Sequence, residues 1–90
     1  LATVKHVSVA KGYSLVEKIA PAAFVGKSLE ELKVRSRFGV EVILIKPGRD
    51  PLQLEEDGAA LMPTAGYRIR EGDALVLFGE DENIAALEQM

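Results

Sequence analysis

A capped helix signal followed at once by an apolar strand constrains the fold of this chain more than any other feature. Ser28 can cap a helix with its hydroxyl, and Glu31 can reach back to the Ser28 backbone N–H, which is the capping-box pattern. Gly39 is a natural end for the helix, because glycine adopts a positive φ without steric cost. The sequence therefore predicts a helix over residues 28–37 that leads directly into a strand over residues 40–46.

The strand predicted over residues 40–46 is apolar on both faces through its middle, Val42-Ile43-Leu44-Ile45. Strands that are buried on both faces have this pattern, so we expect this one in the interior of a sheet. Alternating or apolar runs predict further strands, the first of them at a sheet edge. These runs cover residues 4–9, 15–20 and 74–79, with brief extended segments at 60–62 and 67–70.

The predicted order of elements indicates a two-layer α+β domain. Two helices, the second opening at the acidic run Glu80-Asp81-Glu82, would cover one face of a mixed, mainly antiparallel sheet. Ninety residues allow a single domain, with an N-terminal strand at about 4–9 and a core over about 13–88. We expect the chain to be a fragment of a longer protein, because it starts at Leu1 without Met. The glycine- and proline-rich loop over residues 47–64 is expected to be its most mobile part.

Composition argues against several functional classes. The net charge of the chain is −3, whereas nucleic-acid-binding domains present a basic surface. We therefore expect no nucleic-acid partner. No apolar run approaches the roughly 20 residues that span a bilayer, so no direct membrane insertion is expected. The chain has no cysteine, and its one histidine, His6, lacks an evident partner for metal binding or catalysis. We therefore expect no metal site, no required cofactor and no enzymatic activity.

A basic segment in the middle of the chain is the one candidate for ligand chemistry. Lys33, Arg35 and Arg37 fall late in the predicted helix, with Lys33 and Arg37 four residues apart and so on one side of it. Arginine can hold a phosphate through two hydrogen bonds. The alternative interpretation is a solvated helix face whose arginine stems cover apolar surface.

Four segments also carry a family pattern through their order and spacing. The segments are Ser14-Leu15-Val16-Glu17, Val25-Gly26-Lys27-Ser28-Leu29-Glu30-Glu31-Leu32, Arg37-Phe38-Gly39-Val40 with Val42-Ile43-Leu44-Ile45-Lys46, and Ile69-Arg70-Glu71-Gly72-Asp73-Ala74-Leu75-Val76-Leu77-Phe78-Gly79. From about residue 13 to residue 87 they resemble the C-terminal regulatory subdomain of RCK proteins (regulators of potassium conductance), the TrkA-C domain.

The resemblance implies a non-enzymatic regulatory domain that forms a homodimer and senses ligands. Its implied partner is a membrane transporter or channel subunit for potassium or another monovalent cation. The implied location is cytoplasmic, peripheral to the inner membrane through that transporter. The resemblance also implies a separate N-terminal Rossmann-type half that binds nucleotide or NAD, which we expect to lie outside these 90 residues.

Some members of that family bind cyclic di-AMP at the dimer interface, and the resemblance carries their site onto this chain. Arg35 matches their ligand-binding arginine, and Ile43 and Pro63 match apolar positions around the ligand. Position 41 is Glu where those members carry Asn. A carboxylate at this position repels a phosphodiester and cannot donate a hydrogen bond as an amide does.

Two other interpretations remain open from the sequence. One is a small-molecule or metal sensor domain of similar fold, attached to an anion permease or a transcriptional regulator. The other is a fragment of an enzyme whose active site lies elsewhere in the parent chain.

Overall fold

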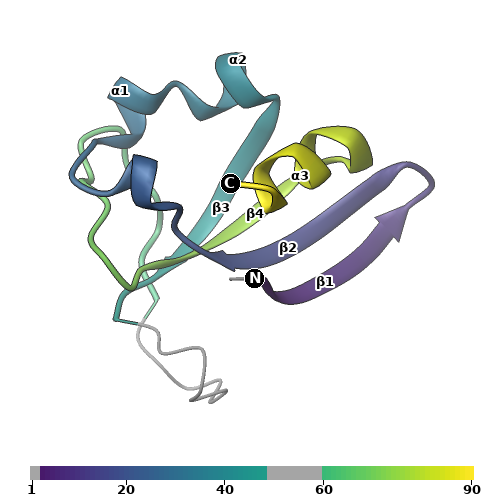
Figure 1. The fold of residues 1–90 in the computed structure, drawn as a ribbon, viewed down its shortest axis with the longest axis horizontal. Helices are drawn as coiled ribbons and strands as arrows, with labels where there is room; N and C mark the ends of the chain where they lie inside the picture. Colours follow the sequence, from purple (N-terminus) through teal and green to yellow (C-terminus); the bar gives the residue numbers. More distant parts are fainter. Residues whose placement is uncertain (1–2, 49–59) are drawn as a thin grey trace.

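Four antiparallel strands form one open sheet, with all helices packed against a single face of it (Figure 1). The structure is a computed structural model that describes residues 3–48 and 60–90. The strands lie in the order β1-β2-β4-β3. They are β1 (Thr3–Ala10), β2 (Tyr13–Ile19), β3 (Val40–Lys46) and β4 (Ala74–Glu80).

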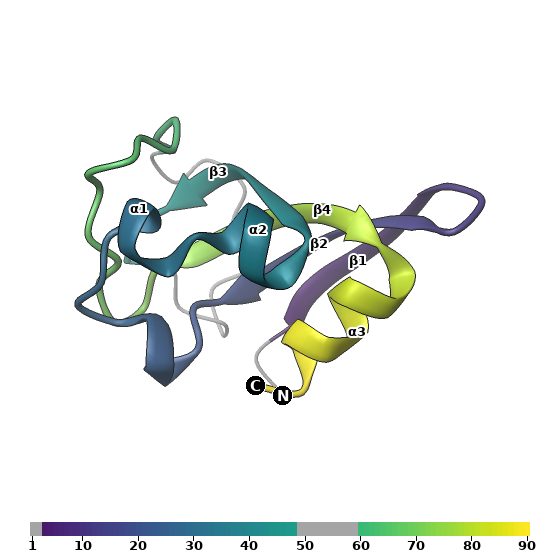
Figure 2. The same cartoon turned by 90° about the horizontal axis from the view of Figure 1, so that it is seen from above.

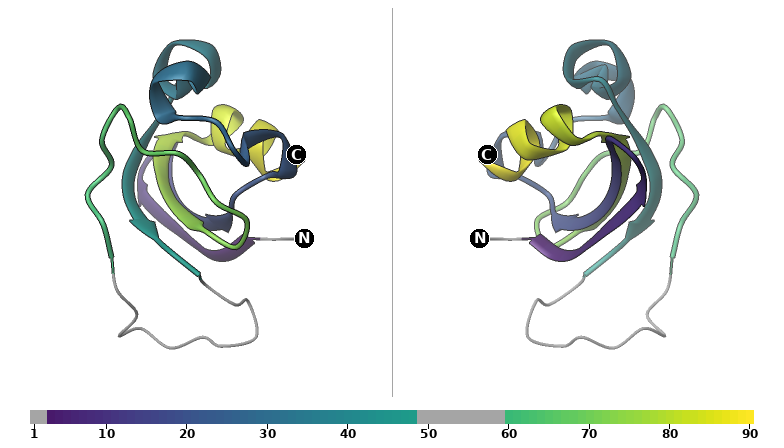
Figure 3. Two further views of the ribbon diagram at one scale, coloured as in Figure 1. Left: turned by 90° about the vertical axis from the view of Figure 1, so that its left-hand side faces the viewer. Right: turned by 90° about the vertical axis from the view of Figure 1, so that its right-hand side faces the viewer.

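The helical layer consists of short elements. Figures 2 and 3 show them gathered over the concave side of the curved sheet. They are the 3-10 helix η1 (Ala22–Phe24) and the α-helices α1 (Leu29–Leu32), α2 (Val34–Phe38) and α3 (Asp81–Glu88). The two-layer α+β prediction is therefore confirmed, and every strand pair in the described part of the chain is antiparallel.

One apolar cluster lies between the two layers. Its members come from the strands, from every helical element and, in the case of Ala20 and Ile69, from connecting segments. They are Val16, Ala20, Phe24, Leu32, Val34, Val40, Ile45, Ile69, Leu75, Leu77, Ile84 and Leu87.

The predicted interior position of the 40–46 strand is wrong, because β3 is a sheet edge and β4 is central. The register of β3 against β4 shifts between Val42 and Leu44, so Ile43 is the extra residue of a β-bulge and lies 41% exposed. A bulge changes which residues face each side of the sheet. Val42 and Ile45 consequently both contact the core, although they are three residues apart. The run of apolar residues thus reflects a bulged edge strand rather than burial on both faces.

The predicted continuous helix over residues 28–37 is also wrong. Lys33 has φ 48° and ψ 51°, which ends α1 and starts α2. Leu32 and Val34 are both buried, and a regular helix would point these two side chains in different directions. The left-handed residue between them lets both reach the core. Because Lys33 is not helical, the argument that it shares a helix side with Arg37 does not hold.

The other predicted strands and the terminal helix agree with the structure where it describes them. The predicted edge strand, now β1, is at the edge, and the terminal helix begins at Asp81. Leu61 forms an isolated bridge with Ile45, and Arg68 forms another with Ser28. Most of the 47–64 loop lies outside the described residues, so its predicted mobility stays a prediction.

Gly39 offers a test of how α3 fixes the turn between α2 and β3. Its φ is +70°, and a Cβ at this position would lie 2.5 Å from the amide nitrogen of Asn83. We expect Gly39→Ala to lower the free energy of unfolding by about 1–2 kcal/mol, mainly from the left-handed backbone and to a smaller extent from displacement of the Asn83 side chain. Urea denaturation measures the loss.

Gly12→Ala is the matched control, because Gly12 has φ +83° and nothing within 4 Å of its Cβ position. It should show only the backbone part, about 1 kcal/mol. Adding Asn83→Ala should recover part of the loss in Gly39→Ala and none of it in Gly12→Ala. Equal losses in the two glycine variants would contradict a steric role for Asn83.

Candidate functional site

A groove of about 460 Å³ opens beside the start of β3. Its walls come from α1, α2, the first three residues of β3 and the segment 63–65. The lining residues are Leu29, Glu30, Lys33, Val34, Arg35, Ser36, Val40, Glu41, Val42, Pro63, Thr64 and Ala65.

The groove brings together three of the four residues named for a ligand site from the sequence. Arg35, Glu41 and Pro63 all line it, although Pro63 follows them by more than twenty positions in the chain. Ile43 does not line the groove, because the bulge places it on the exposed part of the edge strand. Lys33 is at the groove, whereas Arg37 stacks over the ring of Phe38, 5.4 Å from its centroid.

Arg35 and Glu41 form an ion pair across the turn between α2 and β3. Their side chains approach to 2.5 Å and are 81% and 47% exposed, respectively. The turn itself is closed by the N–H of Gly39, which donates to the Arg35 carbonyl at 3.0 Å. A chain reversal at Gly39 therefore places the two charges side by side, an arrangement that the sequence reasoning did not predict.

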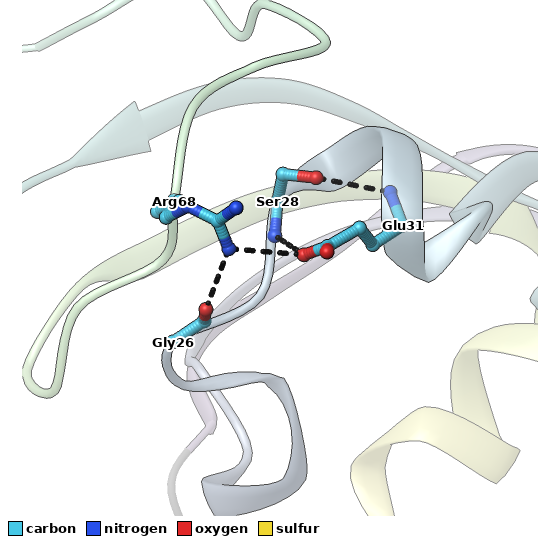
Figure 4. A network of polar contacts seen from close by, with 4 residues as sticks. All are labelled: Gly26, Ser28, Glu31 and Arg68. Atoms are coloured by element: carbon cyan, nitrogen blue, oxygen red, sulfur yellow. Dashed lines mark hydrogen bonds and ion pairs between the residues drawn. The ribbon is translucent and has the colours of Figure 1, made fainter.

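A polar network anchors the start of α1, the helix that contributes Leu29 and Glu30 to the groove (Figure 4). The Glu31 N–H donates to the Ser28 hydroxyl at 3.0 Å, and the Ser28 N–H donates to the Glu31 carboxylate at 2.8 Å, so the predicted capping box is confirmed. Arg68 donates to the same carboxylate at 3.1 Å and to the Gly26 carbonyl at 3.0 Å. The hydrogen bond from the Ser28 backbone, followed by the Arg68 charge, lowers the pKa of Glu31.

The segment after Pro63 is held against α1 by backbone hydrogen bonds. The N–H groups of Leu29 and Glu30 donate to the carbonyls of Tyr67 and Ala65, at 3.1 and 2.9 Å. The first N–H groups of a helix lack partners within the helix, so a neighbouring segment can satisfy them. These bonds fix the Pro63 wall of the groove, and no sequence motif indicated them.

Tyr67 extends this support to the turn before β4. Its hydroxyl donates to the carboxylate of Asp73 at 2.6 Å, and the Arg70 N–H donates to the same oxygen at 2.9 Å. Asp73 is only 1% exposed. Burial, followed by the hydrogen bond and the negative charge of Asp73, raises the pKa of Tyr67 to about 12.

The groove combines apolar walls with two basic and two acidic side chains, which suits binding of a partly apolar, charged small molecule. Over residues 3–48 and 60–90, no group of three or more His, Cys, Asp or Glu side chains could hold a metal ion. None of the helices described is both long and apolar enough to cross a membrane. His6 is not among the residues that line the groove, and its imidazole Nδ1 lies 3.4 Å from the carboxylate of Glu88.

Comparison with known proteins decides the family. The family model of the TrkA-C domain matches residues 14–90 of this sequence. The chain belongs to the TrkA-C domain family. This family is the C-terminal domain of RCK proteins, as the resemblance indicated.

Two relatives from Bacillus subtilis (strain 168) match almost the whole TrkA-C domain. The Ktr system potassium uptake protein C is 25% identical over 84 residues, 93% of this chain and 34% of the relative. The Ktr system potassium uptake protein A is 30% identical over 83 residues, 92% of this chain and 34% of the relative. This chain therefore spans about a third of the length of either relative.

Solved structures share the fold. The RCK domain of GsuK superposes with a TM-score of 0.71 and 26% identity over 98% of this chain and 19% of that one. The RCK C domain of the potassium transport protein KtrA was solved in complex with cyclic diadenosine monophosphate (c-di-AMP). It superposes with a TM-score of 0.68 and 23% identity, over 89% of this chain and 85% of that one. The likeness to KtrA at this identity establishes the fold alone.

The raised pKa of Tyr67 predicts a loss of stability in alkali. Because the pKa rises from its usual 10 to about 12 on folding, the contribution is complete below pH 10 and is lost as the pH rises through 12. The free energy of unfolding of the native protein should fall over this window relative to that of Tyr67→Phe.

At pH 7 Tyr67→Phe should be less stable by about 1–3 kcal/mol, because the buried Asp73 carboxylate loses a hydrogen-bond donor. Denaturation curves at several pH values measure both effects. Parallel pH dependence in the two proteins would contradict the assignment.

Proposed function

We propose that this TrkA-C domain regulates a potassium or other monovalent-cation transport system from the cytoplasmic side of the membrane. Membership of the TrkA-C family carries the proposal. The matches to two Ktr system potassium uptake proteins support potassium as the transported ion. The domain would act without catalysis. Ligand binding or assembly of the domain would change the transport activity of a membrane transporter or channel subunit.

We propose further that the domain acts as a homodimer. Three exposed apolar side chains lie along or beside the β3 edge, namely Ile43 at 41%, Leu61 at 41% and Met62 at 75% exposed. Exposed apolar residues that gather at one place favour a protein partner. A second copy placed here would cover this edge and bring two grooves close to each other.

Sedimentation velocity at tens of micromolar should therefore give a dimer. Met62→Asp should weaken the dimer at least tenfold, because a charge would be buried in an apolar contact. Val9→Asp is the control, since Val9 is 55% exposed on β1, the strand at the opposite edge of the sheet. A native monomer, or dissociation by Val9→Asp alone, would contradict the proposed interface.

The ligand that we propose for the groove is c-di-AMP, as in the KtrA complex. Arg35 stands at the rim, where its guanidinium can hold a phosphate, and the apolar walls formed by Val34, Val40 and Pro63 can contact the adenine rings. Ile43 lies outside the groove of one protomer, so its predicted contact would require the partner's presence or a ligand that extends past the rim.

Calorimetric titration with c-di-AMP tests this site. Arg35→Ala should weaken binding at least tenfold, because a charge-assisted hydrogen bond contributes roughly 1.5–3 kcal/mol. Arg37→Ala is the matched control, since it removes the same charge from α2 at a residue that does not line the groove. No heat with the native domain, or equal loss in both variants, would refute c-di-AMP binding at this groove.

A further inference from the structure

The charges at the groove balance one another. Four ionisable side chains line it, with Lys33 and Arg35 positive and Glu30 and Glu41 negative, so their formal sum is zero. An anionic ligand therefore meets no net attraction from the groove itself. Its binding depends on the local arrangement of these four groups.

Arg35, the group best suited to hold a phosphate, already has an anionic partner. The Glu41 carboxylate lies 2.5 Å from its guanidinium. Both residues line the groove, and the turn at Gly39 keeps them on either side of one short chain reversal. A ligand phosphate that binds Arg35 must share this guanidinium with the carboxylate or displace it.

We propose that Glu41 is an internal competitor for the anion site and lowers the affinity of every anionic ligand that binds Arg35. This inference rests on the proposed role of Arg35 in holding a phosphate. In the resting domain Glu41 neutralises Arg35. Every anion that binds Arg35 must compete with this carboxylate, and a ligand that offers two phosphate oxygens to the guanidinium competes better than one with a single charged oxygen.

The exposure of the pair determines the size of the effect. Arg35 is 81% and Glu41 47% exposed, and exposed ion pairs contribute little to stability. Glu41 therefore lowers the affinity for an anion without closing the site. Loss of the pair, together with loss of the carboxylate's repulsion at about 4 Å, corresponds to a gain of about three- to tenfold in affinity.

Glu30 provides a matched control within the same groove. It carries the same charge and lines the same cavity, but it lies in α1, away in the chain from the turn that joins Arg35 to Glu41. Glu30→Gln and Glu41→Gln change the net charge of the groove equally. Only Glu41→Gln releases Arg35, so the pair of variants separates competition from general electrostatics.

The experiment titrates four proteins, native, Glu41→Gln, Glu30→Gln and Glu41→Gln with Arg35→Gln, with inorganic pyrophosphate at low salt. Binding is followed in all four proteins through the NMR signals of the backbone amides at the start of β3, and also through the Arg35 side chain in the three proteins that keep it. We expect Glu41→Gln to bind three- to tenfold more tightly than native and Glu30→Gln to change less than twofold. The double variant should lose the gain.

Each other result overturns the proposal. Equal gains in Glu30→Gln and Glu41→Gln would reduce the effect to net charge. A gain that survives Arg35→Gln would show that Glu41 does not act through Arg35. If none of the four proteins binds pyrophosphate, the groove has no anion site at Arg35.

The same proteins titrated with c-di-AMP distinguish this proposal from the proposed ligand. If Glu41 competes with pyrophosphate but no protein binds c-di-AMP, c-di-AMP is not the ligand and the competition by Glu41 still holds. If the native protein and Glu41→Gln bind c-di-AMP with equal affinity, Glu41 does not compete and c-di-AMP remains the proposed ligand.

Discussion

The burial of Leu32 and Val34 on either side of one left-handed residue is the constraint on which the rest of the groove depends. Lys33 adopts φ 48°, a conformation that costs a residue with a Cβ about 1–2 kcal/mol. The two flanking side chains, 4% and 6% exposed, offset that cost through contact with the core. Five residues are too few to form a stable helix alone, so α2 exists because this packing holds it. The position of Arg35 is therefore set by the apolar core rather than by helix propensity.

The sequence predicted the features that depend on neighbouring residues and missed those that depend on tertiary packing. The capping box of Ser28 and Glu31 was predictable because all its atoms belong to one turn. The break at Lys33 was not, because lysine shows no preference for a left-handed conformation and only the core explains it. The edge position of β3 was also missed, since a bulged strand with an apolar run gives the same pattern as an interior strand.

The candidate site shows the same division. Family resemblance supplied Arg35, Glu41, Ile43 and Pro63, and the fold brings three of them to one groove. Ile43 is displaced by a bulge that no local pattern indicated. The contact between Arg35 and Glu41 was missed because it depends on the direction in which the chain reverses at Gly39. Residue identity thus predicted the composition of the site, while the backbone determined which of its charges are already paired.

Irregular register at both sheet edges has a consequence for how the domain can associate. The β2–β4 pairing is regular along its whole length, whereas β1 and β3 each carry register shifts, and Leu61 occupies backbone groups of β3 at Ile45. Regular exposed edges recruit further strands and lead to open-ended aggregation, and bulges prevent this. Backbone pairing is therefore a poor route for joining two copies of this sheet. Association through side chains can close on itself, so two copies of this sheet can join without adding further copies in an open-ended series.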